Sequence, residues 1–532
     1  MDHCASVLTH FSPRAEDGTC LGDDAFDRLI NVHVGRVQKL FKDSAGIVAA
    51  HSLQLLDCLD AATHTYSYLA LLDIILPTEA ALYDSIEPAI SDKILAFLVA
   101  FDPRQVRYIG SAFTHVFTAV SSGRILPASV AVEALARALA KIDPTGCMMT
   151  SNHLLLAKLA YHTNNARAAL PVLGRSIVFY PGMATYREAD RLCSLRLPPP
   201  SYISKDTGLT LPLKSSQVLE FDYILGLLHS SVRDWAAAHE AFARVVSYPA
   251  RDNGISKITV EAHKHWVLTG LLLYGKVAAS PRQTSNATTK VCSTINKVYM
   301  QLVEHFDAPN ATTLLAELVV SFGDVFAADG NLSLVHEVVA AHPKWKIARL
   351  RRVYTNVSLA AIRKTITSTP PATDSTDSTT NNDDDDYFDI VSLLQDMIDT
   401  GMIKAVIRRP SAATAQPPSS TEGIETTKAG GGGQTHEPYL EFLPEEEEMS
   451  EAAFATKIAA LAAKVQALEP LHKTTNEHLS LNRDYVRQYI RELKREKEDV
   501  DRDVFGGGVG GASMYDVDVD EEDLMTDTMG GF

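Results

Sequence analysis

Residues 387–407 read YFDIVSLLQDMIDTGMIKAVI, a stretch in which a helical pattern gives way to a strand pattern. The first part predicts an amphipathic helix, because apolar residues recur every three or four positions, at Phe388, Val391, Leu394 and Ile398. Gly401 should end that helix, and an alternating apolar set then predicts a short strand, with Ile403, Ala405 and Ile407 on one face. A helix that runs directly into a strand is typical of the last helix and the first wing strand of a winged-helix fold.

The chain before this stretch predicts helices almost throughout. Between about residues 27 and 249 the breaks are prolines, at Pro77, Pro88, Pro103, Pro127, Pro144 and Pro198–Pro200. Residues 128–142, ASVAVEALARALAKI, are a clear example, whose apolar stripe consists of Val132, Leu135, Ala136 and Leu139. Alternating β-branched runs between tight turns are missing from this region, so an extensive sheet is not expected.

A helix-pair repeat lies between residues 218 and 249. Leu225-Gly226, Ala238 and Phe242 fall at the offsets of a tetratricopeptide-type pair. We expect Gly226 and Ala238 to be small where the two helices cross, and Phe242 to fill the space between successive pairs. Pairs of this kind stack into an α-solenoid. Further helices are expected in residues 256–276, 290–306, 312–328 and 333–342, and residues 344–366 predict a connecting helix followed by the first helix of the winged module.

Residues 439–443, YLEFL, predict the returning wing strand, and residues 451–497 then predict one long amphipathic helix. Its apolar seam has heptad spacing, at Phe454, Ile458, Leu461, Val465 and Leu468. Pro470 should kink or interrupt the helix, after which the stripe continues at Leu479, Val486, Ile490 and Leu493. Burying the first five side chains would contribute about 10 kcal/mol gross. No later segment can cover this stripe, so it requires partner helices.

Low-complexity sequence interrupts and follows these elements. Residues 368–386 and 409–436 are rich in small and polar residues, and from residue 501 the chain is Gly-rich and then acidic. We expect none of these segments to fold, because they carry too little apolar surface. The formal net charge of −17 comes largely from acids in or beside these segments, which leaves the folded body close to neutral. A basic surface for nucleic acid is therefore not forecast.

The six dispersed cysteines have neither metal-ligand spacing nor a disulfide pattern, and they predict reduced thiols in a soluble intracellular protein. No signal peptide is visible near the amino terminus. The longest apolar stretches are too short for a membrane span. At 532 residues, of which 46% are apolar, the chain should form two or more domains.

The order of these elements resembles the PCI-domain subunits, which are shared by the proteasome lid, the COP9 signalosome and the translation initiation factor three complex. The resemblance is carried by the helical repeats, DTGMIKAVI, the returning YLEF strand and the heptad helix. It is most specific to the signalosome subunit 3 family and covers most of residues 100–495. The similar stretches are residues 104–120, 151–177, 221–250, 261–277 and 358–366.

The resemblance implies a mainly α fold: an α-solenoid of TPR-like repeats, a winged-helix subdomain and a long carboxyl-terminal helix. It divides the chain into helical repeats (1–200), a PCI domain (201–445), a bundle helix (446–500) and an acidic tail (501–532). The PCI domain comprises further repeats (201–345) and a winged helix (346–445) that contains the inserts 368–386 and 409–436.

The implied function is that of a non-catalytic scaffold. The signalosome removes Nedd8 from cullin–RING ubiquitin ligases through another subunit, and its PCI subunits pair by winged-helix edges and bundle their carboxyl-terminal helices. The implied partners are the other signalosome subunits and, indirectly, cullin–RING ligases, in cytoplasm and nucleus. No cofactor is implied. The interface residues would be Met402, Ile403, Ala405, Ile407, Tyr439 and Phe442 in the winged helix, together with the nine apolar residues of the long helix named above.

Three alternatives compete with the scaffold. His263 and His265 have the H-x-H spacing of a metalloprotease, but the positions expected for its Ser and Asp are Leu273 and Lys276. A nucleic-acid adaptor could use the basic cluster Lys344, Lys346, Arg349, Arg351 and Arg352, although the helix before the wing carries three acids and no basic residue before Lys404. A PCI subunit of the proteasome lid is the third alternative.

Overall fold

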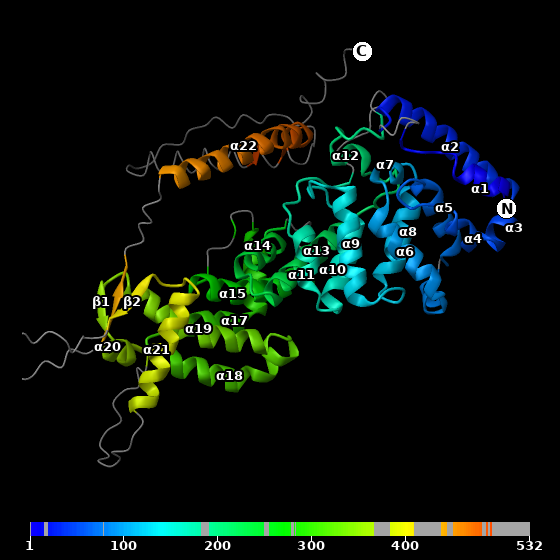
Figure 1. The fold of residues 1–532 in the computed structure, drawn as a ribbon. Helices are drawn as coiled ribbons and strands as arrows, with labels where there is room; N and C mark the ends of the chain where they lie inside the picture. Colours follow the sequence, from blue (N-terminus) through cyan, green and yellow to red (C-terminus); the bar gives the residue numbers. More distant parts are fainter. Residues whose placement is uncertain are drawn as a thin grey trace, which may run out of the picture. The chain divides into compact units, whose positions relative to one another are not determined.

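The computed structural model describes residues 2–14, 20–77, 79–181, 191–248, 255–277, 281, 284–366, 383–408, 438–443, 451–480, 486–487 and 490–491. These residues form 22 α-helices, one 3₁₀ helix and three short strands, which confirms the mainly helical class (Figure 1). The chain divides into two compact units, Met1–Glu448 and Met449–Phe532.

In the described amino-terminal part of the first unit, every named element is a helix. Its elements are α1 (Asp2–Leu8), α2 (Asp23–Asp43), α3 (Ala45–Ala50), α4 (Ser52–Asp57), α5 (Thr65–Ile75), η1 (Ala80–Ser85), α6 (Pro88–Ala100), α7 (Pro103–Val106), α8 (Gly110–Ser121), α9 (Ala128–Ile142), α10 (Ser151–His162), α11 (Ala166–Leu173) and α12 (Pro199–Tyr202). Several of the predicted breaks are helix starts, because Pro88, Pro103 and Pro199 occupy the first turn, where a missing N–H costs nothing. The predicted stripe on α9 is buried.

The helices continue into the second half of this unit. They are α13 (Ser215–Ser231), α14 (Trp235–Val246), α15 (Lys257–Tyr274), α16 (Asn286–Ile295), α17 (Lys297–Asp307), α18 (Ala311–Ala328) and α19 (Leu332–Leu350). They share one apolar core to which α13, α14, α15, α17, α18 and α19 all contribute buried residues. This arrangement agrees with a stack of helical repeats.

The predicted repeat at α13 and α14 is confirmed in detail. Gly226 lies against the ring of Phe242, and Ala238 and Phe242 are both fully buried. Phe242 also stacks on the imidazole of His265 in α15, with ring centroids 5.1 Å apart. Phe242 therefore fills the space between one helix pair and the next, as its position in the repeat predicts.

The same three-residue turn joins α10 to α11, α13 to α14, and α18 to α19. In each turn the middle residue has a left-handed backbone, with φ of 54° at Asn164, 63° at Arg233 and 71° at Gly330. In each, the N–H of the third residue also reaches back five positions to a helix carbonyl. These bonds run from Asn165 to Ala160 (3.0 Å), from Asp234 to His229 (3.0 Å) and from Asn331 to Phe326 (2.8 Å). The three turns therefore share one backbone conformation although their residues differ, which indicates repeated helical hairpins.

The helix α19 differs from its prediction, which placed one helix in residues 333–342 and another from residue 344. The structure has a single helix that continues through Pro343. Two residues beyond the proline fix it in place: Ile347 is fully buried, and the indole N–H of Trp345 donates to the carbonyl of Leu272 at 3.2 Å. Burial on this scale outweighs the hydrogen bond that a proline removes.

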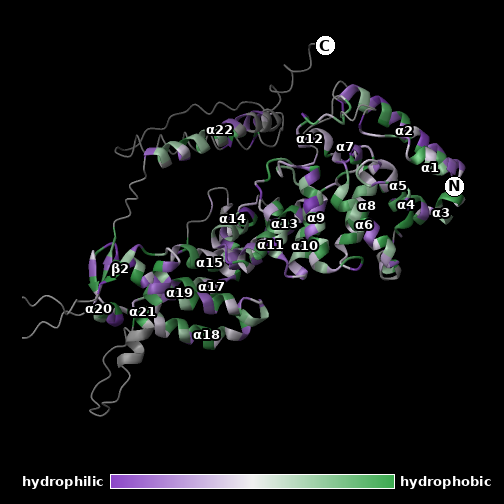
Figure 2. Cartoon of the chain, viewed as in Figure 1, coloured by the Kyte–Doolittle hydropathy of each residue, from purple (hydrophilic) through white to green (hydrophobic). Residues whose placement is uncertain are grey.

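Among the described residues, α18 alone is long and apolar enough to cross a membrane by length and composition, and its hydrophobic character is plain in Figure 2. Buried core helices pass the same test. α18 packs against α17 and α19 and buries Leu315, Leu318 and Phe326 in the shared core. We therefore describe it as a member of the helix stack.

The first unit ends in a small α/β subdomain. Its elements are β1 (Asn356–Ser358), α20 (Leu359–Ile366), α21 (Asp383–Asp399), β2 (Ala405–Arg408) and β3 (Tyr439–Phe442). The three strands form an antiparallel sheet of order β1-β3-β2, so the last strand in sequence lies in the middle. A separate apolar core, which includes Leu394, Met397 and Leu440, joins the sheet to the two helices and to Ile347 of α19.

The transition from helix to strand lies where the sequence predicts it. α21 ends at Asp399, Gly401 has a φ of 72°, and the N–H of Met402 donates to the carbonyl of Met397 at 2.9 Å. The start of α21 differs, because the helix begins at Asp383, inside the predicted insert 368–386. Acidic residues are favourable in the first turn of a helix, where the macrodipole is positive. The rest of that insert, the insert 409–436 and the tail 501–532 lie outside the described residues.

The described part of the second unit is mainly the helix α22 (Glu451–Ser480). It runs without interruption through Pro470, where the sequence predicted a kink or a break. Residues 486–487 and 490–491 are also helical. Hydrophobic and hydrophilic residues are interspersed along α22 (Figure 2).

Candidate assembly surfaces

The outer strand β2 presents one open edge of the sheet. The N–H of Leu443 donates to the carbonyl of Lys404 at 2.8 Å, which fixes the register of alternating hydrogen-bonded pairs along β2 and β3. By that alternation Val406 and Arg408 bond to β3, whereas the N–H and C=O groups of Ala405 and Ile407 point away from it. No described strand pairs with this edge, so its backbone groups are available to a strand from another chain.

The opposite edge is formed by β1. The N–H of Phe442 donates to the carbonyl of Thr355 at 2.8 Å, and the N–H of Leu359 donates to that of Pro438 at 3.0 Å. The outward backbone groups on this side therefore belong to Asn356 and Ser358. Within the described residues the sheet has two unpaired edges, and β3 lies between them.

The side chains predicted for this interface have different environments. Ile403, Ala405 and Phe442 are buried in the subdomain core, Met402 and Ile407 are half-buried against it, and Tyr439 is exposed. The buried three can support an interface only by holding the strands in place. Tyr439 and Phe442 lie on the central strand, so their backbone groups face β1 or β2.

Val406 is an exposed apolar residue of β2 that the sequence reasoning missed. The available signal was the strand alternation, because a pattern that turns Ala405 and Ile407 inward turns Val406 outward. On the same strand Arg408 pairs with Glu441 of β3, with 2.8 Å between Nε and Oε2. The outer face of β2 therefore combines an apolar side chain with an ion pair.

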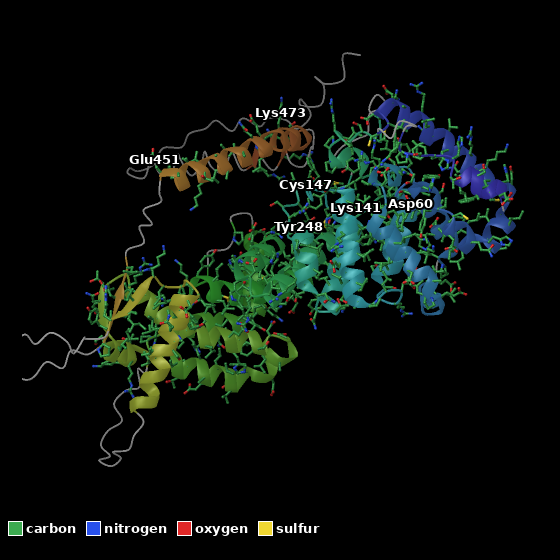
Figure 3. The ribbon with its side chains drawn as sticks, in the orientation of Figure 1. Asp60, Lys141, Cys147, Tyr248, Glu451 and Lys473 are labelled. Atoms are coloured by element: carbon green, nitrogen blue, oxygen red, sulfur yellow. The ribbon has the colours of Figure 1, made fainter. Side chains whose placement is uncertain are left out.

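The apolar stripe of α22 is uncovered within its own unit. Phe454, Ile458, Leu461, Val465 and Leu468 are each at least 50% exposed, and Val486 and Ile490 are exposed as well. Figure 3 marks Glu451 and Lys473 on this helix and shows side chains projecting from it. Leu479 lies in α22, but its side chain is not among those described, and Leu493 lies outside the described residues. A lone helix with such a stripe gains nothing from burial until another helix covers it.

The two histidines considered as metal ligands are buried between repeats. The Nδ1 of His263 lies 3.2 Å from the side-chain amide of Asn296, and the Nε2 of His265 lies 3.2 Å from the hydroxyl of Tyr223. Burial lowers the pKa of each histidine to about 4. No group of three potential ligands occurs among the described residues. In the part of the chain that is described, these histidines are packing residues of the helix stack.

Lys264, between those histidines, lies in a polar network that joins separate parts of the helix stack. It is buried, and its ammonium lies 2.9 Å from Glu261 and 2.8 Å from Asp329. Burial alone would lower the pKa of Lys264, but the hydrogen bonds to Asp329 and Glu261 outweigh it and raise the pKa. The hydroxyl of Tyr299 also donates to Asp329 at 2.8 Å. The network connects α15 to α17 and to the turn between α18 and α19.

Most of the basic cluster considered for nucleic acid makes internal contacts. Lys344 pairs with Asp396 of α21. Arg349 donates to Asp307 (2.8 Å) and to the carbonyl of Gly275 (2.7 Å), and Arg351 donates to the carbonyl of Leu443 (3.3 Å). Contacts to phosphate would compete with these bonds. The cluster therefore joins α19 to its neighbours more than it offers a continuous cationic face.

Comparison with known proteins gives consistent matches. A family model described as the N-terminal helical repeats of COP9 signalosome complex subunit 3 matches residues 25–181 and 201–288. The COP9 signalosome complex subunit 3 of Neurospora crassa is 32% identical over 533 residues, which cover 99% of each chain. The protein of the same name from Emericella nidulans is 29% identical over 315 residues, which cover 57% of this chain and 63% of that one.

Proposed function

The chain belongs to the COP9 signalosome subunit 3 family, and from that premise we propose that it is a non-catalytic scaffold within the complex that removes Nedd8 from cullin–RING ubiquitin ligases. The observation that carries this proposal is the uncovered stripe of α22, from Phe454 to Leu468. A seam with heptad spacing is a surface for partner helices. Its partners would be the carboxyl-terminal helices of the other signalosome subunits, in cytoplasm and nucleus.

The subdomain from β1 to β3 is proposed to be the winged helix of a PCI domain. Three features support this assignment: the order strand, helix, helix, strand, strand; the sheet order β1-β3-β2; and a helix that passes through one glycine turn into β2. The two unpaired edges would allow one neighbour on each side. In this arrangement the backbone of Ala405 and Ile407 makes the contacts, and the exposed Val406 and Tyr439 flank them.

The absence of catalysis is part of the proposal. Among the described residues, His263 and His265 have no third ligand, and their side chains pack between repeats. The polar network around Lys264 holds helices together. The chain would therefore contribute structural contacts between subunits, and the isopeptidase activity would belong to another subunit.

The proposal is tested by removing the helix that carries it. Deletion of residues 451–497 from the full chain should release it from the signalosome, measured by quantitative mass spectrometry after native purification. The purified chain alone should have no isopeptidase activity on a neddylated cullin. Full retention of the deleted chain in the complex would contradict the proposed role of α22.

A further inference from the structure

The helix α2, near the amino terminus, carries four cations that have no acidic partner among the described residues (Figure 1). Arg28, Arg36, Lys39 and Lys42 are all exposed, and no ion pair joins any of them to a described residue. Each helical residue advances about 100°, so the four lie within one arc of about 120°. Asp43 is the one unpaired acid in that arc, and four cations against one acid leave an excess of positive charge.

The other acids of α2 are engaged by neighbouring segments. Asp23 pairs with Arg104 at 2.9 Å, and Asp24 lies 3.2 Å from an arginine that follows α11. Asp27 accepts from the hydroxyl of Tyr108 at 2.7 Å. These carboxylates are therefore occupied within the first unit, and they do not balance the four cations.

The inward face of α2 fixes the helix on the first unit. Its buried stripe consists of Phe26, Ile30, His33, Val37 and Leu40. The guanidinium of Arg104 lies 4.1 Å from the ring centre of Phe26, and Nε2 of His33 lies 2.8 Å from the hydroxyl of Ser67 in α5. α2 is thus held in place by one side, and its other side faces solvent.

Two apolar side chains and a glycine lie among the cations, so hydrophobic and hydrophilic residues are mixed along α2 (Figure 2). Leu29 is 50% exposed and Val32 is 53% exposed, and such surface gains free energy when a partner covers it. A Cβ added to Gly35 would find nothing within 4 Å, so the backbone is open to close approach there. The outward face of α2 comprises Arg28, Leu29, Val32, Gly35, Arg36, Lys39 and Lys42.

We propose that the outward face of α2 binds an acidic amphipathic helix of another protein. The carboxylates of that helix pair with the four cations, its aliphatic side chains cover Leu29 and Val32, and its backbone crosses α2 at Gly35. The face extends about 21 Å, which matches about four turns of a partner helix. The same face of a second copy does not fit, because it would bring like charges together.

Nucleic acid and an anionic membrane also carry negative charge, but the outward face lacks the features that each requires. Bases stack on aromatic side chains, and none of the seven residues of this face is aromatic. A helix that lies in a membrane surface inserts a broad apolar face. The broad apolar face of α2 is the inward one, which is buried in the first unit. An acidic helix therefore fits best.

The test measures the affinity of a synthetic helix for the full chain by fluorescence anisotropy. The probe is a hydrocarbon-stapled, fluorescein-labelled peptide of about 18 residues, with leucines along one face and glutamates on both sides of them. The charge variant replaces the four cations of the outward face by Gln and should bind about tenfold more weakly. A matched variant replaces four other exposed lysines by Gln and should bind as the parent does. These are Lys205, Lys257, Lys290 and Lys297.

Two further variants separate apolar and steric contributions from charge. Leu29→Ser with Val32→Ser should weaken binding about fivefold, because the peptide's leucines lose their partners. Gly35→Trp places an indole where the peptide backbone crosses, and it should weaken binding about tenfold. Gly323→Trp in α18 is its control, because nothing lies within 4 Å of a Cβ there, and it should bind normally. Thermal unfolding should show that all variants remain folded, since every changed residue lies on the surface.

Equal affinities of the parent and the charge variant would overturn the proposal, as would equal losses in the charge variant and the matched variant. Equal binding of a peptide of the same composition, with its leucines spread around the helix, would also overturn it, because the face would then recognise charge alone. Tighter binding of a single-stranded RNA oligonucleotide or of phosphatidylserine vesicles than of the peptide would assign the face to nucleic acid or to a membrane. The scaffold proposal, which depends on α22, is unaffected by these results.

Discussion

The ring of Phe242 lies directly on Gly226: a Cβ placed on that glycine would stand 2.5 Å from Cε1 of the phenylalanine. The two residues come from the paired helices α13 and α14, and their contact sets how closely the helices approach. Phe242 in turn stacks on His265 of α15. The lack of a side chain at Gly226 thus allows α13, α14 and α15 to pack together through the ring of Phe242.

Gly226→Ala should therefore destabilise the protein. The added methyl group must displace a fully buried ring, which costs about 1–3 kcal/mol. Urea unfolding of the full chain measures this loss. Gly323→Ala in α18 is the matched control, because nothing lies within 4 Å of its new Cβ, and it should be neutral or stabilising by up to about 1 kcal/mol. Equal losses in the two variants would contradict the close-crossing interpretation.

Charge placed on the stripe of α22 should prevent assembly. Leu461→Asp with Val465→Asp puts two carboxylates where partner helices would pack, and incorporation into the complex should fall at least tenfold in a competition pull-down. Thr456→Asp with Ala463→Asp adds the same charge to the opposite face, because each helical residue advances about 100°. This control should assemble normally. If both pairs lowered incorporation alike, the stripe would not be the contact surface.

The open edge of β2 can be blocked without breaking the sheet. The N–H of Ile407 points away from β3, so Ile407→Pro removes one donor from the edge and leaves the ladder with β3 intact. The loss of one intermolecular hydrogen bond should weaken incorporation about fivefold, corresponding to about 1 kcal/mol. Ile407→Val keeps the donor and should incorporate normally. A thermal unfolding curve that matches the parent's shows that the subdomain remains folded.

Stability should decrease below pH 6.5 because of His153. Its Nδ1 accepts from the backbone N–H of Thr150 at 3.3 Å, as part of the cap of α10. Burial lowers the pKa of His153 to about 4, so the unfolded chain binds a proton that the folded chain excludes. Between pH 6.5 and 4 the free energy of unfolding therefore falls as the pH falls. By pH 5 the protonation of His153 in the unfolded chain should have lowered the free energy of unfolding by about 2 kcal/mol.

His153→Gln supplies the control for that pH dependence. Glutamine keeps a side-chain acceptor in the capping position but does not titrate. Urea unfolding at pH 7 and pH 5 should show a smaller decrease in the free energy of unfolding for the variant than for the parent. The slope of that free energy against pH should differ by the equivalent of up to one bound proton. An unchanged slope would show that the cap tolerates the imidazolium.

Local patterns were enough to predict the elements whose signals are local. The stripe of α9, the Gly226 and Phe242 pair and the Gly401 turn each depend on residues within a few turns of one another. The seam of α22 was also visible, because heptad spacing needs no knowledge of the rest of the fold. Of these features, the seam of α22 is the one that belongs to a candidate assembly surface.

Long-range packing decided the features that the sequence did not predict. α19 continues through Pro343 because Trp345 and Ile347 find partners on other helices. The central place of β3 depends on pairing with β1, about 80 residues earlier, and no periodicity in either strand reveals it. Ile403, Ala405 and Phe442 were assigned to an interface by their apolar character, which equally suits the core in which they are buried.

The recurrent turn at Asn164, Arg233 and Gly330 has an implication for ancestry. Each helical hairpin is closed by a hydrogen bond within its own main chain. Its geometry therefore depends little on neighbouring helices or on which residues occupy the turn. Such a unit can be duplicated, and the copies can then diverge in sequence until only their shared backbone conformation shows that they are related. An array built this way grows by the addition of whole helical hairpins. Further repeats are therefore best recognised by the backbone geometry of this turn.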